Sequence, residues 1–575
     1  MTFKLSLTEK LIWLAAPLVL FMFFLSVFLY IQLSRPQLSS ADDPAYHLAH
    51  SVAYITGEQL LFPVFSTMST HYADLYYWYH SLLALFLNFF GFDINNYLSL
   101  IAGAKIFHSI LSAFFLTVFF LIARDVIKRE VAMPDRRNII LFSLVATLIL
   151  FFIIPSFTFR LFVYRPHIIA MIFVLAASYF SYRRSVFGVS IVSFFLPFFY
   201  SLALVVLIPP FIHGVSSVLH NGINKLKIFE NIKKFRLFLF ASVSLIAGIF
   251  IRPDSLNYLY NGFYITLLTL FNLFFRGIDN IIELTTPIGN INILAIPFFI
   301  VCGVYYGRIR HIGLKQAFKF ERFYLFILSQ VFFVLMIVIN RASEYAAPMT
   351  VLFLTTVFAG SIIPVLKRLY AGEFDAFFPG AALTEIVIAA KQFLIELARR
   401  KKNLLRVFWA IVGLNVVVPA VFFMNILQQE PAPDMYKGAA EFMRDNSRKG
   451  DIVFQQRFDM YPRLVFFNQN NRYITGMAET FTYAYNPDTF WLWKHIIMSE
   501  PVCPRKKCDK EQSLDIYTVI KDVFKAKYVF IDASKGIGNY PVLNTPDFTA
   551  LLKTDVRFKK VFVDHQYQDI MVFEL

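Results

Sequence analysis

Long runs of apolar residues, separated by short polar segments, set the organisation of this chain. Residues 11–31 (LIWLAAPLVLFMFFLSVFLYI) and 139–154 (IILFSLVATLILFFII) are examples. About 20 apolar residues cross a hydrocarbon core of ~30 Å, so such runs predict transmembrane helices. The first run is too long for a signal-peptide core and predicts a retained anchor. The pattern predicts about eleven spans, at 11–32, 97–123, 139–155, 163–181, 187–200, 202–219, 237–251, 291–307, 323–340, 349–366 and 405–425.

Polar segments between these spans indicate the orientation. Five of them are basic, at 123–137, 182–184, 224–236, 308–322 and 367–403. Because Lys and Arg concentrate on the cytoplasmic side, we expect a multi-pass plasma (inner) membrane protein with a cytoplasmic N-terminus and an extracytoplasmic C-terminus. The net charge of +16 fits this bias, and we expect no nucleic-acid partner.

Two apolar segments do not fit a simple crossing. If residues 76–92 (YYWYHSLLALFLNFFGF) crossed the membrane, every later basic loop would lie outside, so they predict an interfacial helix with Tyr and Trp at headgroup level. Within 187–219, Pro197, Pro209 and Pro210 predict short or broken helices.

A polar region begins after residue 425. We divide the chain into a transmembrane domain, 1–425, with an outer loop at 33–96, and an extracytoplasmic α/β domain, 426–575. Residues 451–456, 527–534 and the closing hairpin 559–575 predict strands, and 513–526 predict a helix. Another helix, over 439–450, is expected to end at Gly450. Cys503 and Cys508 are compatible with a local disulfide or with two free thiols.

The outer loop carries the strongest chemical signal, the adjacent carboxylates Asp42 and Asp43. Acidic residues beside a membrane span are costly unless they bind or catalyse. Asp43 and Pro44 predict the start of a helix, which places Asp43, His47 and His50 on one face at i, i+4 and i+7. The alternative is that the acidic pair only caps this helix. The two histidines suit metal ligands or, as we expect, polar partners in a wet loop.

Other charged residues are expected on the same outer surface. Arginine is disfavoured on that side, and a lipid phosphate, which a guanidinium binds bidentately, would explain its presence. The alternatives are that Arg165 and His167 anchor a helix start, that Arg341 snorkels, and that Glu344 simply pairs with Arg341. The outer-surface set comprises His71, Asp74, Arg160, Arg165, His167, Arg252, Asp254, Arg341 and Glu344.

The outer loop resembles that of the GT-C superfamily of polytopic glycosyltransferases. The acidic pair after the first span and the YYWYHSLLALFLNFFG stretch are similar to the protein mannosyltransferase and aminoarabinose transferase branch. DDPAYH also resembles the acidic loop of oligosaccharyltransferases. The resemblance implies transfer of a sugar, usually with inversion, from a polyprenyl-phosphate donor to a lipid, glycan or protein acceptor outside the membrane.

Within this resemblance, Asp43 is the expected base, assisted by Asp42. His47, Arg165, His167, Arg252, Asp254, Arg341 and Glu344 are the expected substrate-binding residues. Two departures stand out. No WWDYG-type motif occurs, the nearest text being FWLWK at 490–494, and the next outer loop, 155–167, lacks a carboxylate. These gaps argue against transfer to Asn and against an obligatory metal, so no cofactor is certain and a divalent metal remains possible.

Two other classes of function remain open. A transporter or lipid flippase should bury charges near the membrane midplane, and Lys105 and His108 in the span 97–123 are the main candidates. A non-catalytic envelope polysaccharide assembly protein, with the outer domain binding partners, is the third class.

Overall fold

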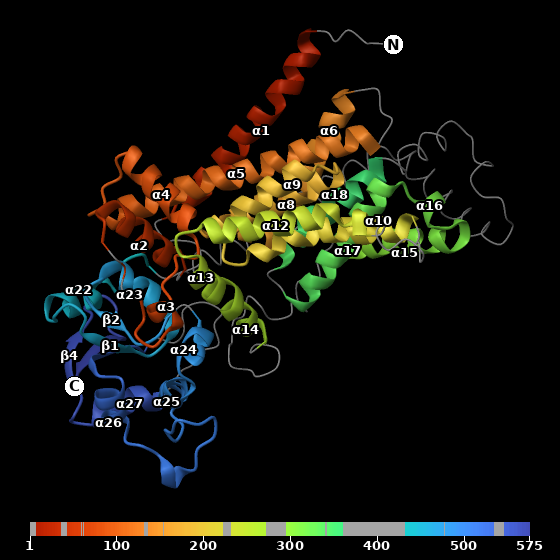
Figure 1. The fold of residues 1–575 in the computed structure, drawn as a ribbon. Helices are drawn as coiled ribbons and strands as arrows, with labels where there is room; N and C mark the ends of the chain where they lie inside the picture. Colours follow the sequence, from red (N-terminus) through yellow and green to blue (C-terminus); the bar gives the residue numbers. More distant parts are fainter. Residues whose placement is uncertain are drawn as a thin grey trace, which may run out of the picture.

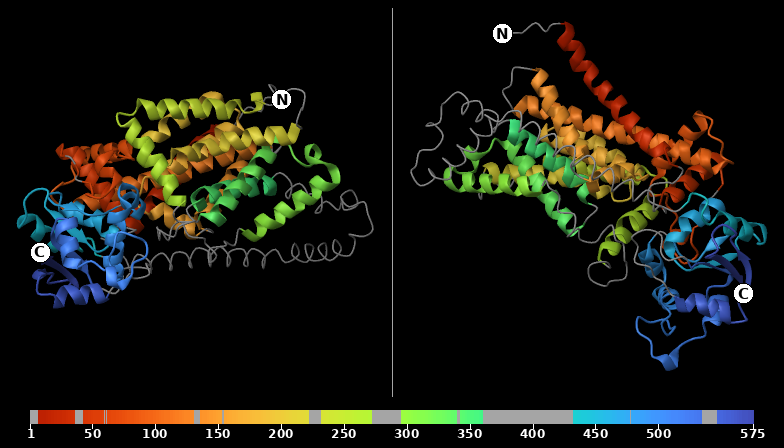
Figure 2. Two further views of the ribbon diagram at one scale, coloured as in Figure 1. Left: turned by 60° about the horizontal axis from the view of Figure 1, so that its bottom comes forward. Right: turned by 180° about the vertical axis from the view of Figure 1, so that it is seen from behind.

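A helical part and a small α/β domain make up the computed structural model (Figures 1 and 2). It describes residues 7–35, 43–58, 60, 62–130, 136–152, 155–221, 232–271, 295–339, 342–359, 432–476, 478–533 and 546–575. The predicted span 405–425 and the predicted domain boundary near residue 425 lie outside these residues.

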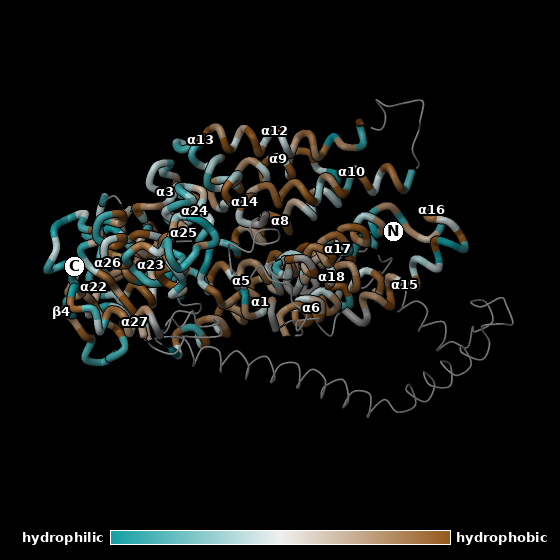
Figure 3. The backbone as a smooth tube through the Cα atoms, turned by 90° about the horizontal axis from the view of Figure 1, so that it is seen from below, coloured by the Kyte–Doolittle hydropathy of each residue, from teal (hydrophilic) through white to brown (hydrophobic). Residues whose placement is uncertain are grey.

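Apolar helices lie side by side along one long direction, and Figure 3 shows their hydrophobic colouring against the more polar C-terminal part. Their bounds are α1 Leu7–Leu33, α5 Tyr97–Glu130, α6 Arg136–Phe152, α8 His167–Tyr182, α9 Val186–Phe195, α10 Ile208–Asn221, α12 Arg236–Ile251, α15 Ala295–Ile312, α17 Phe320–Val338 and α18 Ser343–Val357. By length and composition, four described helical stretches can cross a membrane, at Trp13–Leu33, Tyr97–Glu130, Ala203–Asn221 and Phe320–Ile337. The protein is therefore a membrane protein, and the count of about eleven spans stays a prediction.

Close helix contacts build this bundle. α1 packs along α5, α17 packs on α18, and α9 packs on α12. Gly248 of α12 permits the last contact, because a Cβ atom there would lie 2.1 Å from the carbonyl oxygen of Phe194. Small residues at such crossings let helix backbones approach closely in membranes.

Of the two exceptional segments, 187–219 is broken as expected, whereas the interfacial position expected for 76–92 stays a prediction. The 187–219 region is broken, since α9 ends at Phe195 and two short 3₁₀ turns, Leu196–Phe198 and Ala203–Leu207, precede α10. Helix α4, Tyr77–Phe89, has 13 residues, fewer than the ~20 that a crossing requires. It packs against α2 (Asp43–Thr56) and α5.

Shorter helices connect the long ones or lie at their ends. They are α3 Thr67–Thr70, α7 Pro155–Phe162, α13 Ser255–Tyr258, α14 Thr266–Phe271 and α16 Leu314–Ala317. Figure 1 shows α2, α3 and α4 gathered at the end of the bundle that faces the α/β domain.

The α/β domain contains a five-stranded mixed sheet of order β2-β1-β3-β5-β4. β1 pairs in parallel with β2 and β3, whereas β5 pairs antiparallel with β3 and β4. The strands are β1 Ile452–Gln455, β2 Arg472–Tyr473, β3 Ala526–Asp532, β4 Lys559–Val563 and β5 Ile570–Glu574. The helices are α22 Lys437–Asp445, α23 Tyr461–Phe467, α24 Glu479–Tyr485, α25 Pro487–Met498, α26 Ile516–Thr518 and α27 Pro546–Thr554.

Three predicted strand regions are confirmed, including the closing hairpin. The expected end of the first helix at Gly450 was wrong, because α22 stops at Asp445 with Asn446 as its C-cap. Gly450 instead occupies a turn with a positive φ of 94°, a conformation that favours glycine.

The outer loop is hydrogen-bonded to the β2 edge of the sheet in the α/β domain. The amide of Val64 donates to the carbonyl of Tyr473 at 2.7 Å, and the amide of Phe65 donates to that of Ile474 at 3.1 Å. The ring of Phe65 also packs edge-on against Phe524, with 5.4 Å between centroids. The domain therefore holds the outer loop directly, and α23 packs on α2.

Candidate active-site surface

Asp74, in the outer loop between α3 and α4, is the centre of a buried polar cluster. Its side chain is 2% exposed and accepts hydrogen bonds at 2.9 Å from the Tyr54 hydroxyl and from the Tyr76 amide. His80 Nδ1 lies 2.8 Å from Asp74 Oδ2. Burial alone would raise the pKa of Asp74, but the attraction of His80 and these hydrogen bonds lower it well below its usual value. Asp74 is therefore a carboxylate at neutral pH.

Helix α2 contributes two histidines to the same cluster. His47 Nδ1 lies 2.8 Å from His80 Nε2, and the rings of His50 and His80 stack with centroids 4.7 Å apart. The i, i+3 spacing of His47 and His50 puts both on one face of α2. This arrangement agrees with the helix face expected from the sequence.

Both histidines of α2 are buried, so the expectation of a wet loop was wrong. His47 is 3% exposed and His50 is 2% exposed. Burial is the largest cause that lowers the pKa of His47, and the neighbouring His80, His50 and Arg165 lower it further. Burial also lowers the pKa of His50 to about 3, against the opposing attraction of Asp74. Their aromatic neighbours exclude water: the Tyr46 ring lies 4.3 Å from that of His50.

His80 belongs to this cluster but was not singled out from the sequence. It lies in the aromatic segment YYWYH, where α4 begins. A lone histidine on the buried face of an otherwise apolar helix was the available signal. Only the fold shows that this face meets α2 and Asp74.

Arg252, which follows α12, is bound by protein groups. Its Nε and Nη2 donate to the Asp254 carboxylate at 2.9 and 3.0 Å. Nη2 also donates to the Asp74 carbonyl at 2.6 Å, and Nη1 donates to the Pro197 carbonyl. Four donors of the guanidinium's five are thus engaged, and its side chain is 0% exposed. The outer loop is thereby attached to the turn after α9.

Arg160 and Glu344 form a second buried contact. Arg160 Nε donates to Glu344 Oε1 at 2.6 Å, joining α7 to the first turn of α18. His167 Nε2 lies 2.8 Å from the Arg160 carbonyl, which ties the start of α8 to α7. Arg165 is 6% exposed and lies near enough to His47 to affect its pKa. The structure thus groups Arg160, Arg165, His167 and Glu344 on neighbouring elements.

Three of the expected residues are not described at the side-chain level. Asp42 and Arg341 lie outside the described residues. Asp43 is the first residue of α2, one helical turn before His47 and so about 6 Å from it along the axis. The expected roles of these residues stay predictions.

Lys105 and His108 lie in the N-terminal third of α5, and the expectation that this end faces outside stays a prediction. Lys105 donates to the carbonyl of Arg35, just beyond the end of α1, and His108 Nε2 lies 3.0 Å from the Leu161 carbonyl. Both side chains therefore contact the ends of neighbouring elements, where their polar atoms find backbone partners.

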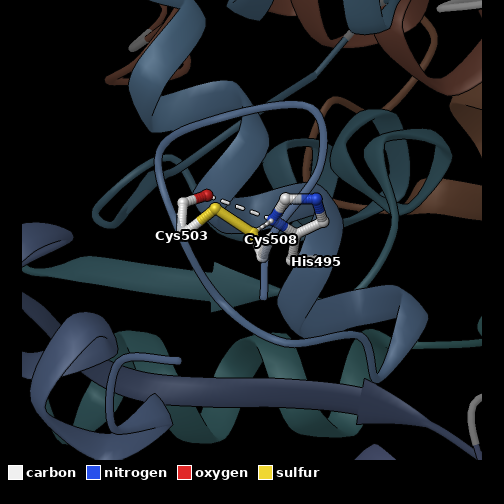
Figure 4. A group of neighbouring side chains, drawn as sticks. All are labelled: His495, Cys503 and Cys508. Carbon is white, nitrogen blue, oxygen red and sulfur yellow. Dashed lines mark hydrogen bonds between the residues drawn. A yellow bond between two sulfur atoms is a disulfide. The ribbon is translucent and has the colours of Figure 1, made fainter. Parts of the chain in front are cut away.

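The α/β domain holds a disulfide between Cys503 and Cys508, which resolves the open choice in favour of the local bridge. His495 Nδ1 lies 3.1 Å from the Cys503 carbonyl and 3.4 Å from Cys508 Sγ (Figure 4). Thiolates, rather than disulfide sulfurs, bind metal ions. The group formed by His495, Cys503 and Cys508 therefore contains a covalent cross-link instead of thiolate ligands.

Solved structures with a similar fold include membrane glycosyltransferases, although no family model and no curated protein matches the chain. The archaeal oligosaccharyltransferase AglB from Archaeoglobus fulgidus, in complex with an inhibitory peptide and a dolichol-phosphate, matches with a TM-score of 0.51 and 12% identity over 92% of this chain and 70% of that one. The Archaeoglobus fulgidus oligosaccharyltransferase tethered to an NVT acceptor peptide matches with a TM-score of 0.51 and 12% identity over 91% of this chain and 70% of that one. This chain shares the fold of these two oligosaccharyltransferases.

ArnT from Cupriavidus metallidurans, bound to undecaprenyl phosphate, matches with a TM-score of 0.48 and 12% identity over 97% of this chain and 98% of that one. The fold implied by the outer-loop resemblance is confirmed by the two oligosaccharyltransferase structures.

Proposed function

We propose that this GT-C protein is an integral membrane glycosyltransferase that moves a sugar from a polyprenyl-phosphate donor to an extracytoplasmic acceptor. The main support is its fold, which it shares with AglB, a protein solved with a dolichol-phosphate and with peptides. The acidic pair at the start of α2 adds a chemical reason. Two adjacent carboxylates titrate at separate pH values, which leaves one of them more basic.

In the proposed reaction, the acceptor hydroxyl oxygen attacks the anomeric carbon of the donor. The bond from that carbon to the lipid-phosphate oxygen breaks, and Asp43 takes the hydroxyl proton, assisted by Asp42. The departing lipid phosphate carries the bonding electron pair away. A single displacement of this kind inverts the configuration at the anomeric carbon of the sugar.

Arginines are proposed to stabilise the charge that develops on the leaving phosphate. Arg165 and Arg341 are our main candidates for this role. Arg252 contributes less directly, since four of its donors already serve Asp254, Asp74 and Pro197. His167, His47, Asp254 and Glu344 are proposed to shape the same surface around donor and acceptor.

The acceptor class is broader than that of an oligosaccharyltransferase. The FWLWK segment, which is the text nearest to a sequon-binding motif, belongs to α25, where Trp493 is 1% exposed in the hydrophobic core of the α/β domain. The FWLWK segment itself carries no Asp that could bind an acceptor asparagine, and Asp488, the acidic residue of α25, lies in its exposed first turn. We therefore propose a lipid, glycan or protein hydroxyl as acceptor.

The test is sugar transfer by membranes that contain the wild-type chain, D43N or the matched control D93N. Asp93 is an exposed carboxylate between α4 and α5 and is remote from α2 in sequence. Loss of a general base lowers rates by roughly 10²–10⁴-fold, so D43N should lose transfer while D93N retains it.

Equal transfer by D43N and wild type, at equal expression, would contradict the assigned base. Absence of transfer by wild type with every polyprenyl-phosphate sugar tested would contradict the proposed function. A lipid-translocation assay on the same membranes would then test the flippase alternative.

A further inference from the structure

His50, Asp74 and His80 bring three potential metal ligands together from three separate segments. Their ligand atoms all lie within 4.8 Å of one another, and all three side chains are buried. His50 comes from α2, Asp74 from the outer loop, and His80 from α4. The sequence separations, 24 residues and 6 residues, give no recognisable metal motif, so only the fold reveals this group.

His50 lacks the polar partners that a buried imidazole requires. Within the described part of the chain, its Nε2 has no hydrogen-bond partner, although the side chain is 2% exposed. Its Nδ1 lies 3.9 Å from Asp74 Oδ2, which is too long for a hydrogen bond. A buried polar group without a partner is costly, because it has given up its hydrogen bonds to water.

Groups around the three residues hold them in the way that metal ligands are commonly held. Ligating histidines usually donate their second ring N–H to an acceptor, and His80 Nε2 lies 2.8 Å from His47 Nδ1. The Tyr54 hydroxyl and the Tyr76 amide each donate to Asp74 at 2.9 Å. The cluster therefore has outer partners that fix the ligand orientations.

The donor set selects the kind of ion. Two imidazole nitrogens and one carboxylate oxygen suit zinc and similar first-row ions, whereas calcium and magnesium prefer oxygen ligands. A dication with one carboxylate leaves one net positive charge. The nearby charge of Arg252 does not add to it fully, because Asp254 pairs with that guanidinium.

We propose that His50, Asp74 and His80 bind one divalent transition-metal ion of the zinc type. Within the outer loop, the ion ties α2 and α4 to the segment between α3 and α4 that carries Asp74. Binding replaces the contact between His80 Nδ1 and Asp74 with two metal–ligand bonds and gives His50 its missing partner. This structural role is independent of the proposed sugar transfer.

The experiment uses the full-length chain in detergent, without a polyhistidine tag and stripped of metal by a chelator. It is titrated with Co²⁺ and Zn²⁺, and bound metal is measured by mass spectrometry and by the visible absorbance of Co²⁺. Wild type should bind one ion per chain. H50Q should lose this ion, while the matched control H71Q, on an exposed histidine of the same loop, should keep it.

His47→Ala provides a graded variant, because it removes only the outer partner of His80. Loss of such a partner weakens metal affinity by roughly 10–100-fold without abolishing binding. Wild-type chain that binds no stoichiometric Co²⁺ or Zn²⁺ would overturn the proposal whether or not any variant folds. Equal binding by H50Q and wild type, or loss of the ion in H71Q, would also overturn it. None of these results depends on a sugar donor.

Discussion

The substitution R252K tests whether Arg252 stabilises the fold through its protein contacts or binds the donor phosphate. Lysine keeps the positive charge, but its single amine cannot reach Asp254, the Asp74 carbonyl and the Pro197 carbonyl at once. If the ion pair with Asp254 survives, two hydrogen bonds from a charged donor to backbone carbonyls are lost. At ~1.5 kcal/mol each, these bonds amount to about 3 kcal/mol. That corresponds to roughly a 100-fold loss in the folding equilibrium.

The free energy of unfolding should be measured in detergent micelles by denaturant titration, together with hydrogen exchange of residues 71–76. R252K should unfold at lower denaturant, and those amides should exchange faster because the Asp74 carbonyl loses its donor. R184K is the matched control, since the Arg184–Glu321 pair is 2.8 Å long but half exposed. Exposed pairs contribute ~0–1 kcal/mol, so R184K should change little.

A stabilising role for Arg252 would be contradicted if R252K matched wild type in stability and in hydrogen exchange. If such a variant also lost sugar transfer, Arg252 would act on the phosphate itself. A stability loss shared equally by R184K would show a general intolerance of Arg-to-Lys exchange.

Two further predictions concern packing and covalent structure. G248A should lower the free energy of unfolding by about 3 kcal/mol in the same denaturant titration, because the added methyl group would lie 2.1 Å from the backbone oxygen of Phe194. The control G303A, where an added Cβ has nothing within 4 Å, should be neutral or slightly stabilising. Equal effects of the two substitutions would contradict the α9–α12 contact. Replacing Cys503 and Cys508 by serine opens a loop of sequence separation 5 and should lower the free energy of unfolding by about 2 kcal/mol. Unfolding can be monitored by tryptophan fluorescence, to which Trp491 and Trp493 contribute. Unchanged stability relative to the intact disulfide would contradict this prediction.

Local sequence patterns predicted those parts of the fold that local forces determine. Long apolar runs gave the main helices, and runs rich in Val, Ile and Phe gave β1, β3 and the closing hairpin. β2 was missed because it has only two residues, Arg472 and Tyr473, and exists through pairing with β1 and the outer loop. The α22 end was misplaced because Gly450 serves a turn beyond the helix.

The candidate site was predicted only in part, for the same reason. Helical spacing placed His47 and His50 on one face, but it contains no information on what that face meets. Asp74 and His80 reach it through the packing of α2 against α4. Similarly, Glu344 lies against Arg160, 184 residues away in the sequence. The burial of His47 and His50 depends on these long-range contacts, which helical spacing does not reveal. For this reason the sequence led us to expect a wet loop, whereas the structure has a buried cluster.

The polar contacts of this surface form one continuous chain, which bears on how Asp43 would act. His47 contacts His80, His80 contacts Asp74, and the backbone of Asp74 accepts from Arg252. Arg252 in turn binds the turn after α9, so α2 is connected through buried groups to the helical bundle. Buried, satisfied networks of this kind restrict a structure to one arrangement. The backbone of α2 is therefore fixed on the bundle by buried contacts, which is the kind of support that a proposed base at the start of this helix would need for efficient proton transfer.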